Sequence, residues 1–274
     1  MGVSCGMCDS EHSRAQVYCS RMDSPELEAR QTEGGAVFPS QRGWRLRVEP
    51  GSSKSYRLAQ LDDHGSRSRS HFAWHAPVTV SLRARVSEPL VQGTWGFGLW
   101  NDPFGLACSP EKRSARLPAL PQAAWFFSAS RRSYLSLRHD LPANGFFAQV
   151  FRSGALGGWL FPTTLGLFLD SQSARRRLSD HIAEEAVMVG IDPCAWHRYE
   201  LHWQSASIEF RVDQQLLLKS QISPKPPLGL VVWIDNQYAA FDPQGRLAWG
   251  FEASNAAAWM DIESLECGSG SVAP

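Results

Sequence analysis

Apolar and polar residues alternate in short segments from Phe38 onward, and this pattern predicts β-strands. In Val78–Val86 the even-numbered residues are apolar and the odd-numbered residues between them are polar, as in a strand that buries one face. The segments 196–203 and 208–213 alternate in the same way around a short turn, which predicts a β-hairpin. Further strands are predicted at 44–48, 56–61, 93–100, 123–130, 134–138, 145–151, 230–241 and 259–265. Many short strands at hairpin spacing indicate an all-β sandwich of two sheets.

Residues 153–190 interrupt the alternation and are predicted to form an insertion. Its first half, 154–169, is largely apolar. The spacing of later apolar residues predicts a helix, with one face formed by Leu178, Ile182, Ala186 and Val189. The apolar half would pack against the sandwich, cover a groove or touch a membrane surface; we expect packing against the sandwich.

The two ends of the chain lack periodic hydrophobicity. Residues 1–35 are rich in Ser, Glu, Gly and Arg, and we interpret them as a loosely attached tail. Residues 36–267 then form one sandwich domain, and 268–274 form a second tail. The N-terminal tail holds a C-x-x-C motif at Cys5 and Cys8, with Cys19 downstream. No second such motif follows, so neither a metal nor a cofactor is predicted.

Composition narrows the possible partners. The 274 residues carry no formal net charge, so no overall basic field favours nucleic acid. No stretch reaches the roughly 18 apolar residues of a membrane span. The N-terminus shows no basic segment followed by an apolar run, which a signal peptide would have. We therefore expect a cytoplasmic protein with reduced thiols, whose ligand is a small molecule or an oligosaccharide.

A cluster of aromatic and polar residues marks the expected ligand site. The apolar run 231–234 ends in Asp235, Asn236, Gln237 and Tyr238, which all donate or accept hydrogen bonds. The chain also has eleven Trp and fourteen Phe. Such a combination is typical of a groove in which rings stack on a ligand and polar groups bind its hydroxyls. The other residues assigned to this site are Trp100, Asn101, Trp125, Phe127, Arg138 and Trp233.

Glycines on one face of the predicted strand 93–100 indicate a close approach to its backbone. Gly96 and Gly98 lie two residues apart and therefore share a face. Glycine in a strand lets another group come near the main chain. That group is either a ligand or a large ring from a neighbouring strand, and the sequence leaves both open.

The predicted hairpin resembles one found in glycoside hydrolase family 16, the laminarinase and lichenase group. The resemblance rests on the strings Trp196-His197-x-Tyr199-x3-Trp203 and Ile208-x-Phe210-x-Val212-Asp213. The glycine- and tryptophan-rich segment 93–100 is similar to the strand that precedes the catalytic strand there. The resemblance covers residues 40–265 and implies a concanavalin A-like jelly roll of two curved antiparallel sheets. The strings WGFGLWNDPFG and WIDNQYA are also similar to a bacterial group of this fold class.

The segment in the place of the catalytic strand departs from that family. The family carries E-x-D-x-x-E or E-x-D-x-E there, with nucleophile and acid on one strand face. Here the segment 123–130 reads AAWFFSAS and contains no acid. A retaining mechanism needs two carboxyl groups about 5–5.5 Å apart. This segment cannot supply them, so the remaining candidates for an acid pair are Asp102 and Asp235.

Three functions fit these features, and the sequence does not decide whether the protein is an enzyme. The first is a glycan-binding jelly roll without the usual catalytic carboxylates, and we favour it. The second is a hydrolase of O-glycosyl bonds with Asp102 and Asp235 as a relocated pair. The third is a protein that binds or converts an apolar small molecule, indicated by Trp125-Phe126-Phe127 and the apolar stretch 154–169.

Overall fold

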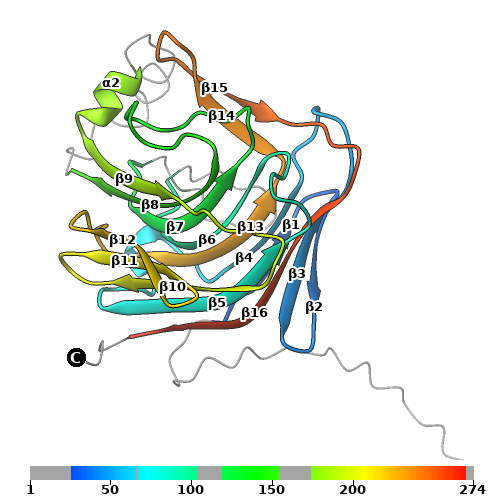
Figure 1. Cartoon of the computed structure of the whole chain (residues 1–274), viewed down its shortest axis with the longest axis horizontal. Helices are drawn as coiled ribbons and strands as arrows, with labels where there is room; N and C mark the ends of the chain where they lie inside the picture. Colours follow the sequence, from blue (N-terminus) through cyan, green and yellow to red (C-terminus); the bar gives the residue numbers. More distant parts are fainter. Residues whose placement is uncertain (1–25, 66, 104–115, 117–118, 155–173, 270–274) are drawn as a thin grey trace, which may run out of the picture.

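The protein is a sandwich of two large antiparallel sheets, which we call sheet I and sheet II. A computed structural model describes residues 26–65, 67–103, 116, 119–154 and 174–269. Within these residues each sheet has seven strands, and the two sheets lie face to face (Figure 1). A two-stranded hairpin stands on the side of sheet I that faces away from sheet II. The predicted all-β jelly-roll sandwich is confirmed.

Sheet I has the strand order β1-β4-β13-β6-β7-β8-β9. Its strands are β1 (Glu28–Gln31), β4 (Leu58–Asp62), β6 (Thr94–Trp100), β7 (Ala123–Ala129), β8 (Gly145–Ser153), β9 (Ile182–Met188) and β13 (Gly229–Asp235). The central strands β6, β7 and β13 are buried almost throughout. Both faces of the sheet are therefore covered, which explains the continuous apolar runs in these strands.

Sheet II has the strand order β12-β11-β10-β5-β16-β3-β2. Its strands are β2 (Gly35–Pro39), β3 (Gly43–Val48), β5 (Val78–Val86), β10 (His197–Trp203), β11 (Ile208–Val212), β12 (Gln215–Ser220) and β16 (Ala258–Gly268). Strands β10 and β11 form the predicted hairpin, with Tyr199 opposite Val212 and Trp203 opposite Ile208. The even-numbered residues of β5 are buried, as their alternation predicts.

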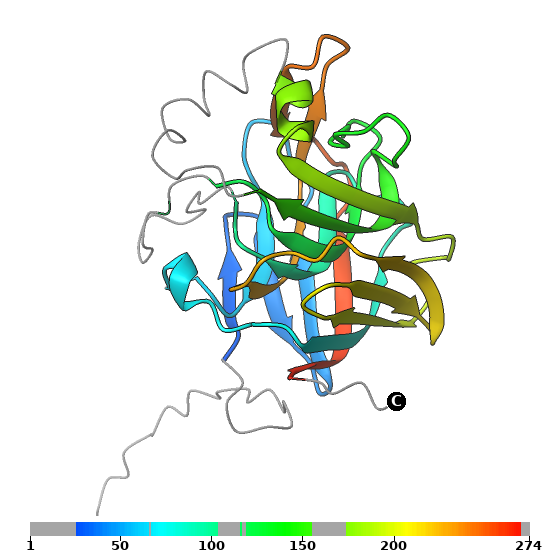
Figure 2. The same ribbon diagram turned by 90° about the vertical axis from the view of Figure 1, so that its left-hand side faces the viewer.

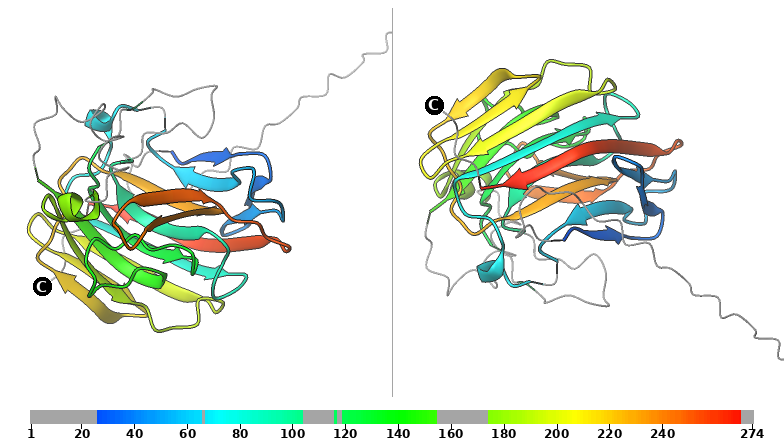
Figure 3. Two further views of the ribbon diagram at one scale, coloured as in Figure 1. Left: turned by 90° about the horizontal axis from the view of Figure 1, so that it is seen from above. Right: turned by 90° about the horizontal axis from the view of Figure 1, so that it is seen from below.

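The main core lies between the two sheets. Sheet I contributes large rings such as Trp95, Phe97 and Phe126, and sheet II contributes Tyr199 and Phe210. The rings of Phe126 and Tyr199 meet edge to face with centroids 5.1 Å apart, a favoured aromatic geometry. Viewed from above and below, strands of both sheets run in similar directions, as in aligned sandwich packing (Figure 3).

Two of the remaining elements lie above sheet I. They are the hairpin of β14 (Gln237–Phe241) and β15 (Leu247–Phe251) and the short helix α2 (Ala174–Ser179). A 3₁₀ turn, η1 (Arg69–His71), lies to the side of the sandwich (Figure 2). The predicted strand 230–241 is thus divided at Asn236 into β13 and β14. Helix α2 lies beside the turn of the hairpin in two perpendicular views (Figures 1 and 2). The backbone N–H of Arg175 donates to the carbonyl of Gly245 across this contact, at 3.2 Å.

The predicted helical insertion is wrong. Among the described residues of that segment, helix is confined to α2, and Ile182–Met188 forms β9, which pairs with β8. Ile182 and Ala186, both assigned to one helix face, share a strand face instead. A separation of four residues is close to one helical turn and equals two strand repeats, so it fits both periods. The apolar stretch 154–169 lies outside the described residues except for Gly154.

Two predicted boundaries also differ. Residues 28–31, assigned to the N-terminal tail, form β1 and pair with β4; most of their side chains are exposed, so they leave no apolar pattern. The segment 134–138 is no strand, since its described residues make only one bridge, from Tyr134 to Ala240. Strand β7 pairs with β6 and β8 instead. Residues 1–25, with their three cysteines, lie outside the described part of the chain.

Gly96 on β6 leaves space for the ring of Trp233 on β13. The two residues are opposite each other in the strand register. A Cβ atom on Gly96 would lie 2.7 Å from the indole and 2.5 Å from the carbonyl oxygen of Phe126. The group that approaches the β6 backbone is therefore a ring from a neighbouring strand, one of the two possibilities that the sequence leaves open.

The substitution Gly96→Ala is expected to lower the free energy of unfolding by about 1–3 kcal/mol, because the added methyl group overpacks this contact. Urea denaturation at neutral pH measures the change. Gly190→Ala is the matched control, since no described atom lies within 4 Å of a Cβ atom at that position. Equal losses of stability in the two variants would contradict the packing of Trp233 on Gly96.

Candidate functional site

The outer face of sheet I, which faces away from sheet II, carries a cluster of aromatic rings. Trp100, Trp125 and Trp233 come from the adjacent strands β6, β7 and β13, and Phe127 joins them. The rings of Trp100 and Trp233 are nearly parallel with centroids 6.3 Å apart. Trp125 lies 5.8 Å from Trp233 and 5.5 Å from Phe127. The structure thus brings together four of the five rings that the sequence assigns to the ligand site; the fifth, Tyr238, is not in this cluster.

These rings are packed closely on the outer face of sheet I; we call this layer the aromatic floor. Trp125 and Trp233 are each 8% exposed. Each indole N–H of the three tryptophans already donates to a protein group. The acceptors are Oγ1 of Thr94 for Trp233 at 2.9 Å, Oε1 of Gln149 for Trp125 at 3.0 Å, and Nε2 of His64 for Trp100 at 3.0 Å. The indole donors are therefore committed to the fold, as is usual for buried tryptophan.

Asp235 is the centre of a buried hydrogen-bond network at the end of β13. Its carboxylate accepts from the hydroxyl of Thr94 at 2.7 Å and from the hydroxyl of Tyr56 at 3.0 Å. The backbone N–H groups of Thr94 and Gln237 donate to the same carboxylate. Burial outweighs these bonds and raises the pKa of Asp235 from 3.8 to about 6. The geometry assigns Asp235 a positioning role toward Tyr56 and Thr94.

The two asparagines assigned to the site hold backbone segments in place. The side chain of Asn236 accepts from the N–H of Arg57 at 2.8 Å and donates to the carbonyls of Ser55 and Glu252. The side chain of Asn101 likewise donates to the carbonyl of Leu120 and accepts from the N–H of Gln122, in the segment that leads into β7. Side-chain amides suit this task because each offers both a donor and an acceptor.

The predicted convergence of Asp102 and Asp235 is wrong. In the register of β6 and β13, Asp235 lies opposite Thr94, whereas Trp100, two residues before Asp102, lies at the other end. Six strand residues span about 20 Å. Asp102 instead forms an ion pair with Arg116 at 2.5 Å. Sequence reasoning failed here because strand register is a long-range property.

Tyr238 and Arg138, two further polar candidates, lie in different surroundings. The hydroxyl of Tyr238 accepts from Nη2 of Arg132 at 2.9 Å, and that guanidinium lies 3.8 Å from the ring centre. Arg138 pairs with Asp140 at 2.5 Å on an exposed surface. Exposed pairs of this kind contribute little stability. The binding roles given to these residues by sequence stay predictions.

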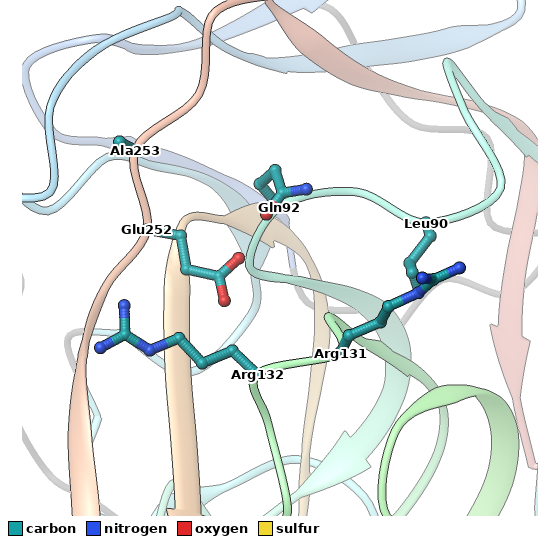
Figure 4. A pocket seen from close by; sticks show the side chains of 6 residues that line it. All are labelled: Leu90, Gln92, Arg131, Arg132, Glu252 and Ala253. Atoms are coloured by element: carbon teal, nitrogen blue, oxygen red, sulfur yellow. The ribbon is translucent and has the colours of Figure 1, made fainter.

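A hollow of about 510 Å³ opens at the end of sheet I, beside the base of the hairpin; we call it the rim hollow. Its lining residues are Leu90, Gln92, Arg131, Arg132, Glu252 and Ala253. Figure 4 shows the carboxylate of Glu252 directed into the space between Gln92 and the arginines. One oxygen accepts from the hydroxyl of Ser130 at 2.7 Å, and the other is buried without a hydrogen-bond partner among the described residues. That oxygen therefore has unused capacity to accept a hydrogen bond.

A strip of partly exposed rings, Tyr56, Trp249 and Phe251, lines the hairpin; we call it the ring strip. Trp249 is 62% exposed, the largest value among the described large hydrophobic residues. Tyr56 stacks on Phe251 with centroids 5.3 Å apart, and Trp249 meets Phe251 at 6.2 Å. Sequence reasoning missed this strip, although the alternation of Leu247, Trp249 and Phe251 after the turn at 242–245 was a usable signal.

A second buried network crosses β7, β8 and β9. The indole of Trp125 donates to Gln149, whose Nε2 donates to Oε1 of Glu184 at 2.7 Å. The N–H of Leu137 donates to the other oxygen of Glu184 at 2.9 Å. Burial raises the pKa of Glu184 despite these bonds. The network fixes the loop after β7 on the outer face of sheet I.

Two classes of site find no support within the described ranges. No group of three or more His, Cys, Asp or Glu side chains there is placed to hold a metal ion. No helix among the same residues is long and apolar enough to cross a membrane. The cysteines of the N-terminal tail and most of the apolar stretch 154–169 lie outside those ranges.

The raised pKa of Asp235 predicts a specific dependence of stability on pH. The folded state holds this proton more tightly than the unfolded state, so the contribution is complete below about pH 4 and is lost as pH rises through 6. A shift of about two units corresponds to about 3 kcal/mol. Asp235→Asn cannot ionise, so its unfolding free energy relative to the wild type should rise by up to that amount between pH 4 and 7.

Urea denaturation at several pH values measures this difference. Asp140→Asn is a useful comparison, because Arg138 lowers the pKa of the exposed Asp140. That variant should show no gain relative to the wild type over the same rise in pH. A constant difference between wild type and Asp235→Asn from pH 4 to 7 would contradict the raised pKa.

Comparisons with known proteins show distant structural similarity only. No family model and no curated protein sequence matches the chain. An alginate lyase solved with dimannuronate, AlyC3, is similar at 8% identity and a TM-score of 0.43, over 82% of this chain and 73% of that one. The carbohydrate-binding module CBM66 from Bacillus subtilis matches at 8% identity and 0.39, over 90% and 98%. LamAcat from Zobellia galactanivorans matches at 16% and 0.41, over 85% and 80%. Similarity at this level says nothing about the chemistry of the site.

Proposed function

We propose that the protein binds a glycan on the outer side of sheet I, where Trp249 of the ring strip stacks on a sugar ring. The observation that carries this proposal is the 62% exposure of Trp249 on the β14–β15 hairpin. Trp249 shares its hairpin face with Phe241 and Leu247, which belong to the aromatic cluster on that side. The exposed ring is therefore continuous with the aromatic floor.

The ring strip has the chemistry that a sugar needs. A pyranose offers an apolar C–H face to an aromatic ring and hydroxyl groups to polar side chains. Gln237 lies opposite Phe251 in the hairpin and is half-buried on the same face as Trp249. Its amide offers both donors and an acceptor to hydroxyls. The proposal thus gives Gln237 the ligand-binding role that the sequence predicts for it.

The floor beneath the strip fixes its geometry. Asp235 accepts from the hydroxyl of Tyr56, and the ring of Tyr56 in turn stacks on Phe251. Phe251 then contacts Trp249. Ordering these side chains before a ligand arrives lowers the entropy cost of binding. In this proposal the buried tryptophans and Asp235 support the site, and Trp249 and Gln237 contact the sugar.

Binding without hydrolysis is the finer part of the proposal. Retaining hydrolysis needs two carboxyl groups about 5–5.5 Å apart, and inverting hydrolysis needs about 6.5–9.5 Å. Strand β7 carries no acid, and Asp102 lies at the other end of the sheet from Asp235. Glu252 is the one acid among the described residues that line the rim hollow. A single carboxylate at this hollow is suited to accept a hydrogen bond from a sugar hydroxyl and does not supply the two acids of a hydrolase.

The substitution Trp249→Ala is expected to weaken glycan binding about tenfold or more, because it removes the stacking face. Isothermal titration with laminarihexaose, cellohexaose and agaro-oligosaccharides identifies a bound sugar and measures the loss. The thermal stability of the variant should stay near that of the wild type, since the side chain is largely exposed.

Phe38→Ala is the matched control, because Phe38 is an exposed ring on β2 of the other sheet. Its affinity should equal that of the wild type. The proposal fails if none of these sugars binds, or if Trp249→Ala binds as tightly as Phe38→Ala.

Neither β7 nor the pair Asp102 and Asp235 supplies two carboxyl groups at the required spacing, which predicts no turnover of the same substrates. Wild-type protein should release no reducing ends from β-glucan, xyloglucan or agarose, and Asp235→Asn should give the same result. A reducing-end assay with prolonged incubation checks this. Release by the wild type that Asp235→Asn abolishes would restore the hydrolase interpretation.

A further inference from the structure

We propose a second ligand site, for a small organic carboxylate, in a hollow between α2 and the turn of the β14–β15 hairpin. This hairpin hollow has a volume of about 730 Å³, within the range of small-molecule pockets. Its lining residues are Tyr134, Leu137, His139, Arg175, Arg176, Ser179, Phe241, Asp242, Pro243, Gln244 and Gly245. No ring-strip residue belongs to this lining, so the site is distinct from the proposed glycan site.

Arg175 is the group that would bind the carboxylate. Its residue is only 9% exposed although it lines the hollow. Nε donates to the carbonyl of Ser136 at 3.0 Å, and Nη1 lies 3.0 and 3.2 Å from the ring nitrogens of His139. The guanidinium carbon lies 5.1 Å from the ring centre of Tyr134. The side chain is thus fixed on three sides.

The remaining nitrogen, Nη2, is buried and has no hydrogen-bond partner among the described residues. Its two N–H groups belong to a permanent cation, so leaving them buried without an acceptor is costly. A carboxylate satisfies this requirement best, because a planar pair of oxygens matches the guanidinium fork. The unpaired donors therefore indicate an anionic acceptor supplied by a ligand.

The charges around the hollow favour an anion. Arg175 and Arg176 both line it, against a single acid, Asp242. One oxygen of Asp242 already accepts from the backbone N–H groups of Gln244 and Arg246 in the hairpin turn, at 2.9 and 2.8 Å. Arg175 interacts electrostatically with Glu184, but no ion pair within the described part of the chain joins it directly to an acid. The guanidinium is therefore available to form a direct ion pair with a ligand.

Glu184 is a buried acid that interacts electrostatically with Arg175, but its hydrogen bonds are made to other groups. Its two oxygens accept from Gln149 and from the N–H of Leu137. Its charge interaction with Arg175 is smaller than the effect of its burial. Glu184 therefore orders the loop after β7 without occupying the unpaired Nη2 of Arg175.

The walls of the hollow define the rest of the ligand. Tyr134, Leu137 and Phe241 present apolar surface next to the guanidinium and belong to or pack against the outer-face cluster. An inorganic anion would leave this apolar surface exposed to water. A carboxylate on a ring or a short carbon body would cover it and gain hydrophobic stabilisation. The inferred ligand class is thus an organic carboxylate.

Two matched probe pairs test the site in the full-length protein: glucuronate against glucose, and benzoate against benzyl alcohol. Ligand-observed NMR titration should show saturable binding of the carboxylates, at least tenfold tighter than their neutral partners. Inorganic sulfate should bind more weakly than either carboxylate. Absence of carboxylate binding, equal binding of the neutral partners, or sulfate that binds as tightly as the carboxylates would overturn the inference.

Substitutions then locate the binding. Arg175→Met should weaken carboxylate binding at least tenfold, whereas Arg246→Met removes the same charge from an exposed position in the hairpin turn and should change it less than twofold. Arg175→Lys keeps the charge without the fork and should weaken binding severalfold, which tests the site even if the Met variant fails to fold. Unchanged binding in the Lys variant, or equal effects at the two arginines, would overturn the assignment.

Trp249→Ala should leave carboxylate binding intact, so this inference and the glycan proposal fail independently.

Discussion

The burial of sheet I on both faces is the constraint on which the rest of this structure depends. One face packs on sheet II, and the other is covered by aromatic rings from β6, β7 and β13. Indole rings buried in this way bring N–H groups that need acceptors. Thr94, Gln149 and His64 supply them. The polar groups on the outer face are thus needed as hydrogen-bond acceptors for the tryptophans buried there.

The hydrogen bonds that satisfy the buried tryptophans also connect the aromatic floor to the partly exposed ring strip. Thr94 accepts from Trp233 and donates to Asp235, and Asp235 accepts from Tyr56. In this way a chain of hydrogen bonds runs from a buried ring to a partly exposed one. Networks of this kind rigidify a structure when every member is satisfied. Two of the buried groups without a hydrogen-bond partner among the described residues, on Glu252 and Arg175, belong to residues that line hollows at the edge of the sheet.

Local patterns predicted the strands that bury one face, and they failed where the outcome depends on distant contacts. Alternation located β5 and the β10–β11 hairpin because sheet II has the simple inside-outside pattern. The same reasoning read Ile182 and Ala186 as helix, since their spacing fits both periods. It also paired Asp102 with Asp235, although only the register of β6 and β13 determines their distance. The sequence pattern did not single out Arg175, because the feature that matters there is a buried Nη2 without a hydrogen-bond partner, and this depends on the folded structure.

The order of strands has a consequence for the behaviour of the protein in concentrated solution. Open sheet margins invite pairing with other chains. Here one margin of sheet I is the four-residue strand β1, with sequence EARQ, and β2 at the margin of sheet II ends in Pro39. On the opposite side β9 and β12 are joined by a hydrogen bond from the hydroxyl of Ser220 to Glu185, at 2.5 Å. Short, charged or proline-ended margin strands such as β1 and β2 disfavour pairing with the edge strand of another molecule.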